Sequence, residues 1–316
     1  MSEIDDIALP APRSNRPVTL MHRVEYALAI VLGAFFRLVG VDAASAIAGG
    51  FTRTVGPLIG AVHRRGQANL RLAFPDWSAA EIEETLRAVW ENLGRTAGEF
   101  AHLEKFDPDD GPDRGGRIEI TGREKFDAVI ESGKPAIFVS GHFTNWEIIP
   151  TVMHGVGLDY AFVFRAANNP LIDGLVIAAR AKVMSRRQIP KGRRGARDII
   201  EALGAGASLA MYVDQKLTSG GIPSPLFGRP AMTAPAAARL ALKFRAPVIP
   251  IEIERLGGAR FRLTVGDAIV FHPSGDTNAD TQAFTDRINL EIERMIRARP
   301  GEWLWLHRRW GKDVVS

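Results

Sequence analysis

The chain has no cysteine among its 316 residues. Disulfide bonds, thiolate nucleophiles and cysteine-ligated zinc sites are therefore excluded, and the composition fits a reducing compartment. The sequence also lacks His-Glu-x-x-His spacing and the glycine-rich fingerprints of nucleotide-binding proteins. It therefore gives no support for a metal or nucleotide cofactor.

A strongly apolar run near the N-terminus, residues 26–36, is short for a membrane span. A spanning helix needs about 20 apolar residues, and Arg37 and Asp42 interrupt the pattern here. We expect an uncleaved helix that lies on or dips into a membrane, within a membrane-associating helical segment over 18–55. Two alternatives stay open: a secretory signal with small residues for cleavage at 43–46, and a buried helix of a soluble domain.

Apolar residues make up 46% of the chain, enough for one large domain. We predict a flexible tail over 1–17, where prolines lie among polar residues, and a single domain over 18–312. Lysine plus arginine number 40 against 36 aspartate plus glutamate, and the sequence pI is about 9.6. This excess favours an anionic partner, whether phospholipid, phosphorylated sugar or nucleic acid.

The order of the apolar runs predicts an α/β fold. The first third is helical in pattern, and Ser78 and Glu81 form a capping box that opens a helix expected to reach about Leu103. Short apolar runs then alternate with helical stretches, which predicts a mostly parallel central sheet flanked by helices. The runs are 136–139, 160–164, 208–213 and 248–253, and the helical stretches are 146–154, 171–184, 194–203 and 234–244. An antiparallel strand over 261–270 and a last helix over 280–297 complete the prediction.

Polar side chains follow three of the predicted strands, at the edge where open parallel sheets bind ligands. His142 follows the first run, Arg165 the second, and Asp214 with Gln215 the third. If these strands are neighbours, the side chains converge on one crevice. Histidine can act as a general base near neutral pH. We expect Glu147, five residues further on, to bond one ring nitrogen and stabilise the imidazolium.

Other interpretations of the same residues stay open. Glu147 can complement a helix dipole while His142 is a hydrogen-bonded core residue. Ser140 is a poor nucleophile-elbow serine, because the elbow requires Gly-x-Ser-x-Gly and the chain reads Val139-Ser140-Gly141. Arg165 suits phosphate or carboxylate, but it can also be a surface arginine. The basic stretch 186–197 is either a solvated face or a site for an anionic ligand such as phosphate or an acidic carrier protein.

A loop rich in glycine and proline follows the third strand and offers an oxyanion site. We expect Thr233 to cap the next helix, and backbone N–H groups between Gly228 and Thr233 to face an oxyanion or phosphate. Near the C-terminus, Trp303, Trp305 and Trp310 are interleaved with basic residues. They predict either an interfacial belt or a packed tail.

Taken in order, these motifs resemble those of a known family. GHFTNWE, at 141–147, looks like the His-x4-Asp/Glu signature of glycerolipid-type acyltransferases. Together with FRAANNPLID, MYVDQ, PLFGRPAMTAPAAARLA and EWLWLHRRW, it is similar to the late acyltransferases of lipid A biosynthesis in Gram-negative bacteria, the lauroyl and myristoyl transferases. The similarity extends from about residue 20 to residue 312.

The resemblance implies an enzyme of the bacterial inner membrane that faces the cytoplasm. It would move a fatty acyl chain from acyl carrier protein to a hydroxyl of a lipid A precursor, with no cofactor and no nucleic-acid partner. By motif position, His142 is the catalytic base and Glu147 its catalytic partner. The residues that the resemblance associates with substrate binding are Arg165, Asn168, Asp214, Gln215, Gly228 and Thr233.

Three other functions stay open at this point. The first is an acyltransferase that uses another glycolipid or a lyso-lipid as acceptor. The second is a hydrolase that uses the same base on water. The third is a non-catalytic membrane-surface protein that binds anionic lipid through the basic stretch 186–197.

Overall fold

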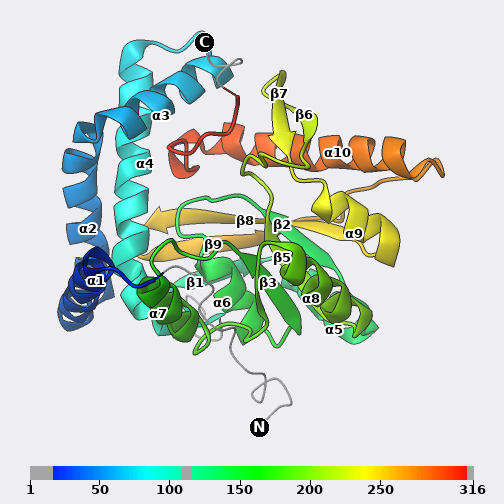
Figure 1. The fold of residues 1–316 in the computed structure, drawn as a ribbon, viewed down its shortest axis with the longest axis horizontal. Coiled ribbons are helices and arrows are strands. Elements are labelled where there is room, and N and C mark those ends of the chain that lie inside the picture. The colour runs from blue at the N-terminus through cyan, green and yellow to red at the C-terminus, as the bar shows by residue number, and fades with distance from the viewer. Residues whose placement is uncertain (1–16, 109–115, 312–316) are drawn as a thin grey trace.

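The computed structural model describes residues 17–108 and 116–311, so the tail predicted over 1–17 lies almost wholly outside the described residues. A helical layer formed by the N-terminal third stands beside the sheet (Figure 1). Its helices are α1 (Leu20–Val39), α2 (Val41–Val55), α3 (Gly60–Ala73) and α4 (Ala79–Glu99). Helices α2 and α4 lie close together because Gly94 and Gly98 face the backbone of α2 at points with no room for a Cβ.

Helix α4 begins as the sequence predicts. The Ser78 hydroxyl oxygen accepts the Glu81 N–H at 3.2 Å, and the Glu81 carboxylate accepts the Ser78 N–H at 2.7 Å. This reciprocal pairing satisfies two backbone donors that the first helical turn leaves without partners. The α-helix ends at Glu99, and the chain continues to the predicted end near Leu103 as a 3-10 helix, Phe100–Lys105.

The central sheet confirms the prediction of a mostly parallel arrangement. In the described part of the chain, its strands run in the order β1-β9-β8-β2-β5-β3-β4. They are β1 (Ile118–Thr121), β2 (Ile137–Ser140), β3 (Tyr160–Phe164), β4 (Gln188–Pro190), β5 (Ser208–Tyr212), β8 (Val248–Gly257) and β9 (Arg260–Val265). Strands β8 and β9 pair antiparallel, and the other neighbours pair parallel.

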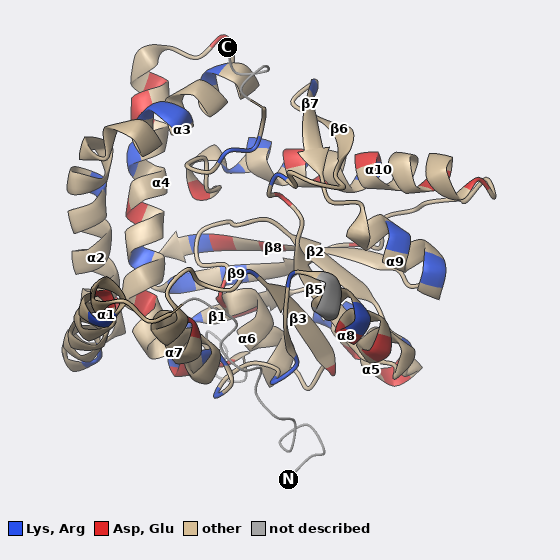
Figure 2. Ribbon diagram, in the orientation of Figure 1, with Lys and Arg blue, Asp and Glu red and all other residues tan. Residues whose placement is uncertain are grey.

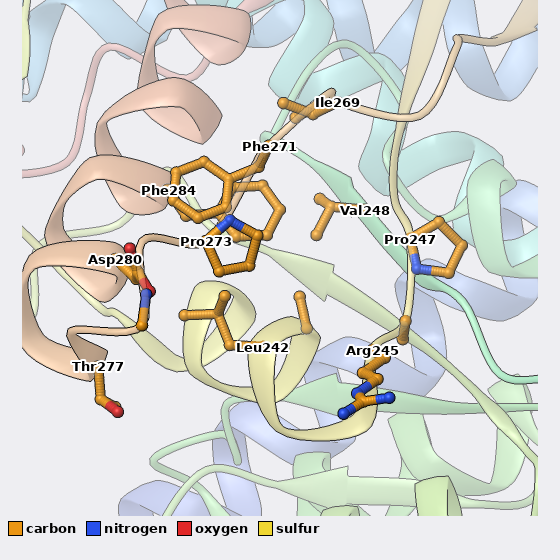
Figure 3. A pocket seen from close by; sticks show the side chains of 13 residues that line it. Leu242, Arg245, Pro247, Val248, Ile269, Phe271, Pro273, Thr277, Asp280 and Phe284 are labelled. Atoms are coloured by element: carbon orange, nitrogen blue, oxygen red, sulfur yellow. The ribbon is translucent and has the colours of Figure 1, made fainter.

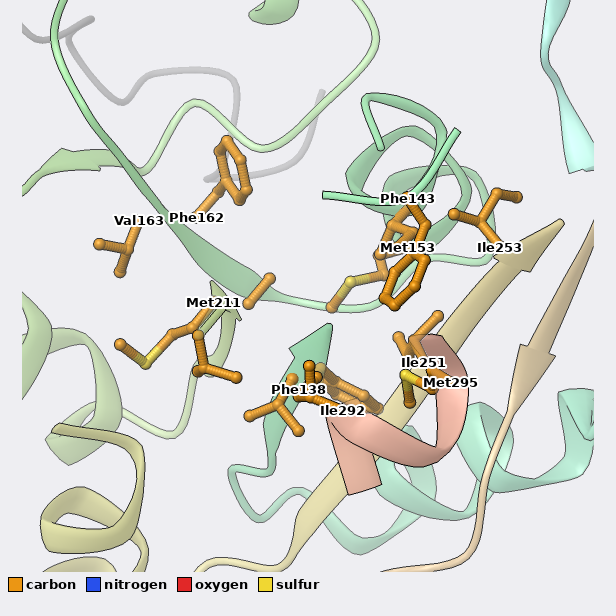
Figure 4. Close-up of a cluster of buried hydrophobic side chains, with 14 of the residues drawn as sticks. Phe138, Phe143, Met153, Phe162, Val163, Met211, Ile251, Ile253, Ile292 and Met295 are labelled. Carbon is orange, nitrogen blue, oxygen red and sulfur yellow. The ribbon is translucent and has the colours of Figure 1, made fainter. Parts of the chain in front are cut away.

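Helices cover both faces of this sheet. They are α5 (Arg123–Ser132), α6 (Ile148–Gly155), α7 (Pro170–Arg180), α8 (Arg193–Gly204), α9 (Ala236–Phe244) and α10 (Thr277–Ala298). Right-handed crossovers between parallel strands put α6 and α7 on one face and α8 and α9 on the other. Phe126 of α5 packs against Phe138 of β2, and α9 contacts both α8 and α10. Side chains from the sheet and from α10 meet in the apolar core, where Phe138, Ile251, Ile292 and Met295 lie together (Figure 4).

A hairpin replaces part of the predicted loop after β5. Strands β6 (Ile222–Leu226) and β7 (Arg229–Thr233) pair antiparallel and pack against α10. Thr233 pairs with Ile222 in this hairpin, so it is not a helix cap. Helix α9 begins later, with Pro235 at the N-cap position and no side-chain cap bond. The prediction of a Thr233 cap is therefore wrong.

Helix α1 contains the apolar run near the N-terminus. Phe36 is its buried residue, whereas Leu28, Val31 and Phe35 are exposed. An ordinary buried helix would not leave such side chains in solvent. None of the helices in residues 17–108 and 116–311 combines the length and the apolar character that crossing a bilayer requires.

Candidate active site

The site begins with two residues that the sheet register brings together. Strands β2 and β5 are parallel neighbours, and Ser140 lies opposite Tyr212. His142 and Asp214 each follow two residues after these paired positions, so they leave the same edge of the sheet side by side. The Nδ1 atom of His142 lies 2.8 Å from Oδ1 of Asp214, and the His142 backbone N–H donates to Oδ2 at 2.8 Å.

The Asp214 carboxylate is enclosed on its other side by the C-terminal segment. The indole N–H of Trp303 donates to Oδ2 at 2.8 Å, and His307 Nε2 lies 3.3 Å from the Asp214 carbonyl oxygen. Burial raises the pKa of the Asp214 carboxyl, but His142 and His307 lower it by more, and the pKa lies well below its usual range. The ionised carboxylate accepts the Nδ1 proton and leaves Nε2 of His142 with its lone pair.

The imidazole of His142 is held between aromatic rings and remains partly open to solvent. Its centroid lies 5.2 Å from that of Trp146 and 4.9 Å from that of Tyr212. The Tyr212 hydroxyl donates to the Trp146 carbonyl oxygen, which ties the two rings together. Gln215 Nε2 lies 3.5 Å from His142 Nε2, and the histidine side chain is 15% exposed. A substrate hydroxyl can therefore approach Nε2 beside Gln215.

Glu147 has a different partner from the one that the sequence predicts. Its carboxylate forms a two-point ion pair with Arg180 at the end of α7, with Nε–Oε2 and Nη2–Oε1 distances of 2.8 and 2.5 Å. The Trp146 indole also donates to it at 3.1 Å. The expected bond from Glu147 to the His142 ring is wrong, because Asp214 occupies Nδ1. A catalytic role for Glu147 stays a prediction.

The turn between His142 and Glu147 is fixed by buried polar contacts. Thr144 has a φ of 30°, which a β-branched residue rarely adopts, and its N–H donates to the Glu302 carbonyl oxygen at 2.7 Å. The Asn145 amide donates to the Glu99 carboxylate at 2.8 Å, and that carboxylate is paired with Arg255. These contacts hold the backbone that carries the histidine.

Two cations extend the site along the edge of the sheet. Arg165 follows β3 and is exposed, as the sequence predicts for a strand-end residue. Lys191 follows β4, and its N–H donates to the Phe164 carbonyl oxygen at 2.9 Å. Desolvation lowers the pKa of the Lys191 ammonium, Asp214 raises it, and Arg165 lowers it. Lys191 thus lies within electrostatic reach of both Asp214 and Arg165, and it belongs to the basic stretch 186–197 for which the sequence left an anion site open.

The asparagine that contacts other elements is the neighbour of the one predicted. Asn168 is exposed in the loop after β3, whereas Asn169 is buried. The Asn169 side-chain oxygen accepts the Leu171 N–H at 3.0 Å and so caps α7. Its amide donates to the His22 carbonyl oxygen at 2.9 Å, which joins α7 to α1.

Gly228 and Thr233 do not form the expected row of oxyanion donors. Gly228 lies in the turn of the β6–β7 hairpin, and Thr233 lies at the opposite end. The Thr233 hydroxyl is buried and accepts hydrogen bonds from Asn289 and Arg309 at 3.0 and 2.7 Å. Since this hydroxyl is paired with internal partners, Thr233 stabilises the fold around the site, and the substrate-binding prediction for the pair is not supported by the geometry.

The tryptophans near the C-terminus are packed inside the protein. Trp303 and Trp305 are 0% exposed and Trp310 is 2% exposed, so the interfacial-belt alternative is wrong. The C-terminal segment therefore supports the His142–Asp214 pair from within.

The basic stretch 186–197 is partly engaged in internal contacts, since Arg187 forms an ion pair with Asp159.

A cavity of about 670 Å³ lies away from this pair. Its walls come from α9, the start of β8, the segment before α10 and the first turns of α10 (Figure 3). Pro247 and Val248 place it at the amino end of β8, whereas His142 follows the carboxyl end of the neighbouring β2. Phe271 and Phe284 stack in it, and no residue of the histidine site lines it.

Comparison with known proteins decides the family. The sequence model of the bacterial lipid A biosynthesis acyltransferases matches residues 15–312. The chain belongs to this family. The family is thus the one that the ordered motifs predicted, and the chain is an acyltransferase of lipid A biosynthesis by family.

Curated relatives agree with the family at modest identity. The lipid A biosynthesis acyltransferase of Haemophilus influenzae is 24% identical over 278 residues, which cover 80% of this chain and 78% of that protein. The lipid A biosynthesis myristoyltransferase of Escherichia coli is 26% identical over 263 residues, covering 80% and 76%. A solved structure, the 1-acyl-sn-glycerophosphate acyltransferase of Thermotoga maritima, aligns at 14% identity with a TM-score of 0.36, over 86% of this chain and 98% of that chain.

Proposed function

We propose that this protein transfers a fatty acyl chain of the lauroyl or myristoyl type from acyl carrier protein to a hydroxyl of a lipid A precursor. The observation that carries the proposal is the 2.8 Å contact between His142 Nδ1 and Asp214. It prepares Nε2 to take a proton from an alcohol. Family membership supplies the acceptor class, and the named relatives act in lipid A biosynthesis.

The proposed reaction starts with the acceptor hydroxyl at Nε2 of His142. The imidazole takes the hydroxyl proton while the oxygen attacks the thioester carbonyl carbon. The new C–O bond forms, the C–S bond breaks, and the leaving thiolate takes the proton from the imidazolium. Asp214 stabilises the imidazolium between these steps. Arg165 and Lys191 carry positive charge that suits the developing oxyanion or an acceptor phosphate.

The helical layer supports a location at the cytoplasmic face of the inner membrane. Leu28, Val31 and Phe35 of α1, with Phe51 of α2, expose large apolar side chains, and α2 is free of charged residues along most of its length (Figure 2). Such a surface is typical of helices that lie in the interfacial plane of a membrane. A carrier-protein donor would be met on the cytoplasmic side.

The proposal is tested with purified protein, acyl carrier protein loaded with laurate or myristate, and a lipid A precursor. His142→Ala should lower kcat by about 10²–10⁴-fold, because it removes the general base. His154→Ala is the matched control, since His154 is exposed at the end of α6. Transfer at the parental rate by the His142 variant would rule out this mechanism.

Mass spectrometry of lipids from cells with and without the gene separates the remaining candidates. Loss of one secondary acyl chain from lipid A supports the proposal. Unchanged lipid A with an altered glycolipid or phospholipid would show another acceptor. Release of free fatty acid without acceptor would show a hydrolase, and lipid binding without any turnover would show a non-catalytic protein.

A further inference from the structure

An apolar groove separate from the histidine site lies between α1, α7 and the end of α4. Its volume is about 510 Å³, within the range of about 300–1,000 Å³ that is typical of small-molecule sites. Ile30 and Phe36 contribute to its wall from α1, Leu175 from α7, and Phe100 from the 3-10 helix after α4. No residue of the His142–Asp214 site lines it.

The groove is open because small residues line part of it. A Cβ built on Gly33 would meet no atom within 4 Å, so the space in front of this glycine is empty. Ala97 and Ala101 also line the groove with short side chains. Asn169 holds α1 to α7 by donating to the His22 carbonyl oxygen and to the Glu25 carboxylate. The two helices are thus tied at one end while the groove between them stays unfilled.

Two cations are the charged residues of this lining. Arg37 comes from α1, and Lys182 follows the end of α7. The Arg37 guanidinium donates to the Ala101 carbonyl oxygen and lies 3.6 Å from the Glu104 carboxylate, but its side chain is still 61% exposed. An apolar groove with exposed positive charge at its edge matches a ligand that has a hydrocarbon chain and an anionic headgroup.

We propose that this groove binds one acyl chain of an anionic membrane phospholipid, with its phosphate beside Arg37 and Lys182. Two observations favour a bilayer lipid over the acyl acceptor. Two apolar residues of its lining, Ile30 and Leu32, are themselves 43% and 51% exposed on α1, so the groove opens at the molecular surface. Its lining does not include the histidine site. The proposal concerns lipid occupancy and stands whether or not the protein transfers acyl chains.

The test uses the full-length protein and vesicles of phosphatidylcholine that contain phosphatidylglycerol with a photoactivatable group in one acyl chain. After irradiation, cross-linked peptides are mapped by mass spectrometry. We expect label in both walls of the groove, at 29–37 and 172–182. A Cβ at position 33 meets no atom within 4 Å, so Gly33→Leu places its side chain in the groove and should abolish this label. Gly50→Leu is the matched control, because Gly50 of α2 also has no atom within 4 Å of a Cβ but lies outside the groove.

The headgroup is tested with Lys182→Gln. Each cation near an anionic surface contributes binding equivalent to about fivefold, so this change should lower the groove label about fivefold. Equal label in Gly33→Leu and the parent would overturn the proposal. Label confined to Leu28, Val31 and Phe35 would also overturn it, because these side chains belong to the outer surface of α1. Displacement of the label by a lipid A precursor would assign the groove to the acceptor instead.

Discussion

Asp214 and Glu147 are both buried carboxylates, and each makes two short contacts with one basic residue. Asp214 receives the ring and the backbone N–H of His142, whereas Glu147 receives the guanidinium of Arg180. Histidine exchanges a proton near neutral pH and arginine does not. The first pair can therefore take part in proton transfer, and the second is a fixed ion pair that anchors α7 to the start of α6.

This comparison shows why distance along the chain is a poor guide to the partner of a base. Glu147 is five residues from His142, and Asp214 is in a different crossover unit. Parallel pairing of β2 with β5 brings Asp214 to the imidazole. Glu147 is the N-cap residue of α6 and turns toward α7. Substituting each carboxylate in turn can therefore distinguish the residue that takes part in catalysis from the residue that anchors a helix.

The largest expected effect is that of Asp214→Asn. The asparagine amide would donate to Nδ1 and favour the tautomer with its proton on Nε2, which cannot accept the hydroxyl proton. We expect kcat for acyl transfer to fall about 10⁴-fold, as in serine-hydrolase triads. Steady-state kinetics with acyl carrier protein thioester measures this. A loss below tenfold in a folded variant would show that Asp214 does not orient the base.

The main expected effect of Glu147→Gln is a lower free energy of unfolding. Removing one partner of a buried ion pair costs about 3–5 kcal/mol, because the other charge is left unpaired. The Arg180 and Glu147 side chains are only 12% and 5% exposed, so solvent offers little compensation. We expect this loss in urea unfolding, and a similar one for Arg180→Met.

The double variant Glu147→Gln, Arg180→Met completes a cycle that tests the comparison. If Glu147 acts only through Arg180, each single variant should lose the same share of acyl-transfer activity. The double variant should then be no less active than either single variant. The opposite result is a stable Glu147→Gln protein that is inactive while Arg180→Met is active. It would restore the direct catalytic role that the sequence motif predicts for Glu147.

Much of the framework could be predicted from sequence because it depends on local signals. The capping box at Ser78, the alternation of apolar runs and helices, and polar residues after strands are all visible in the chain. Strands β1 (IEIT) and β4 (QIP) include polar residues within their four and three positions, so neither forms the apolar run that revealed β2, which is also four residues long. The β6–β7 hairpin was also missed, since its strands contain Pro223, Pro225 and Pro230, and proline argues against a strand.

The site shows the same division between local and long-range information. His142, Asp214 and Gln215 were found because each follows a strand. Their pairing depends on strand order, and no short motif encodes it. Arg180 was missed because it ends an apolar helix without a distinctive neighbour, and Trp303 was recognised only as part of an aromatic tail. A donor that reaches a carboxylate 89 residues away in sequence can be found only from the fold.

A partly buried carboxylate, Glu302, has a side chain that is 16% exposed, and its titration differs from that of Asp214. Burial raises the pKa of Glu302 to about 7, although Arg255 and Arg299 oppose the shift. Below about pH 4.5 the carboxyl is protonated in both folded and unfolded chains. As pH rises toward 7, only the unfolded chain releases the proton, so stability falls across this window.

Glu302→Gln should therefore raise the free energy of unfolding at pH 8 by about 3 kcal/mol. Near pH 4 the change should be close to neutral, since glutamine resembles the protonated acid. Urea unfolding of both proteins at the two pH values measures the effect. An equal difference at both pH values would mean that Glu302 titrates normally in the fold. Asp214 has the opposite sign, because its lowered pKa removes stability as pH falls.

The smallest expected effect on activity comes from removing the hydrogen bond that Trp303 donates to Asp214. Trp305→Phe is the matched control for Trp303→Phe. Trp303 and Trp305 are both fully buried, but the Trp303 indole donates to the Asp214 carboxylate and the Trp305 indole to the Pro300 carbonyl oxygen, each at 2.8 Å. Trp303→Phe removes a hydrogen bond to a charged group, so we expect kcat/KM to fall about tenfold.

The pH dependence distinguishes this role from simple packing. Without the indole donor the carboxylate is less stabilised, so the acid limb of the kcat/KM profile should move to higher pH in Trp303→Phe. Trp305→Phe removes a hydrogen bond to a neutral carbonyl and should cost about 1 kcal/mol of stability with no movement of that limb. Equal profiles for the two variants would mean that Trp303 only fills space, and that His142 and His307 keep the Asp214 carboxylate charged without it.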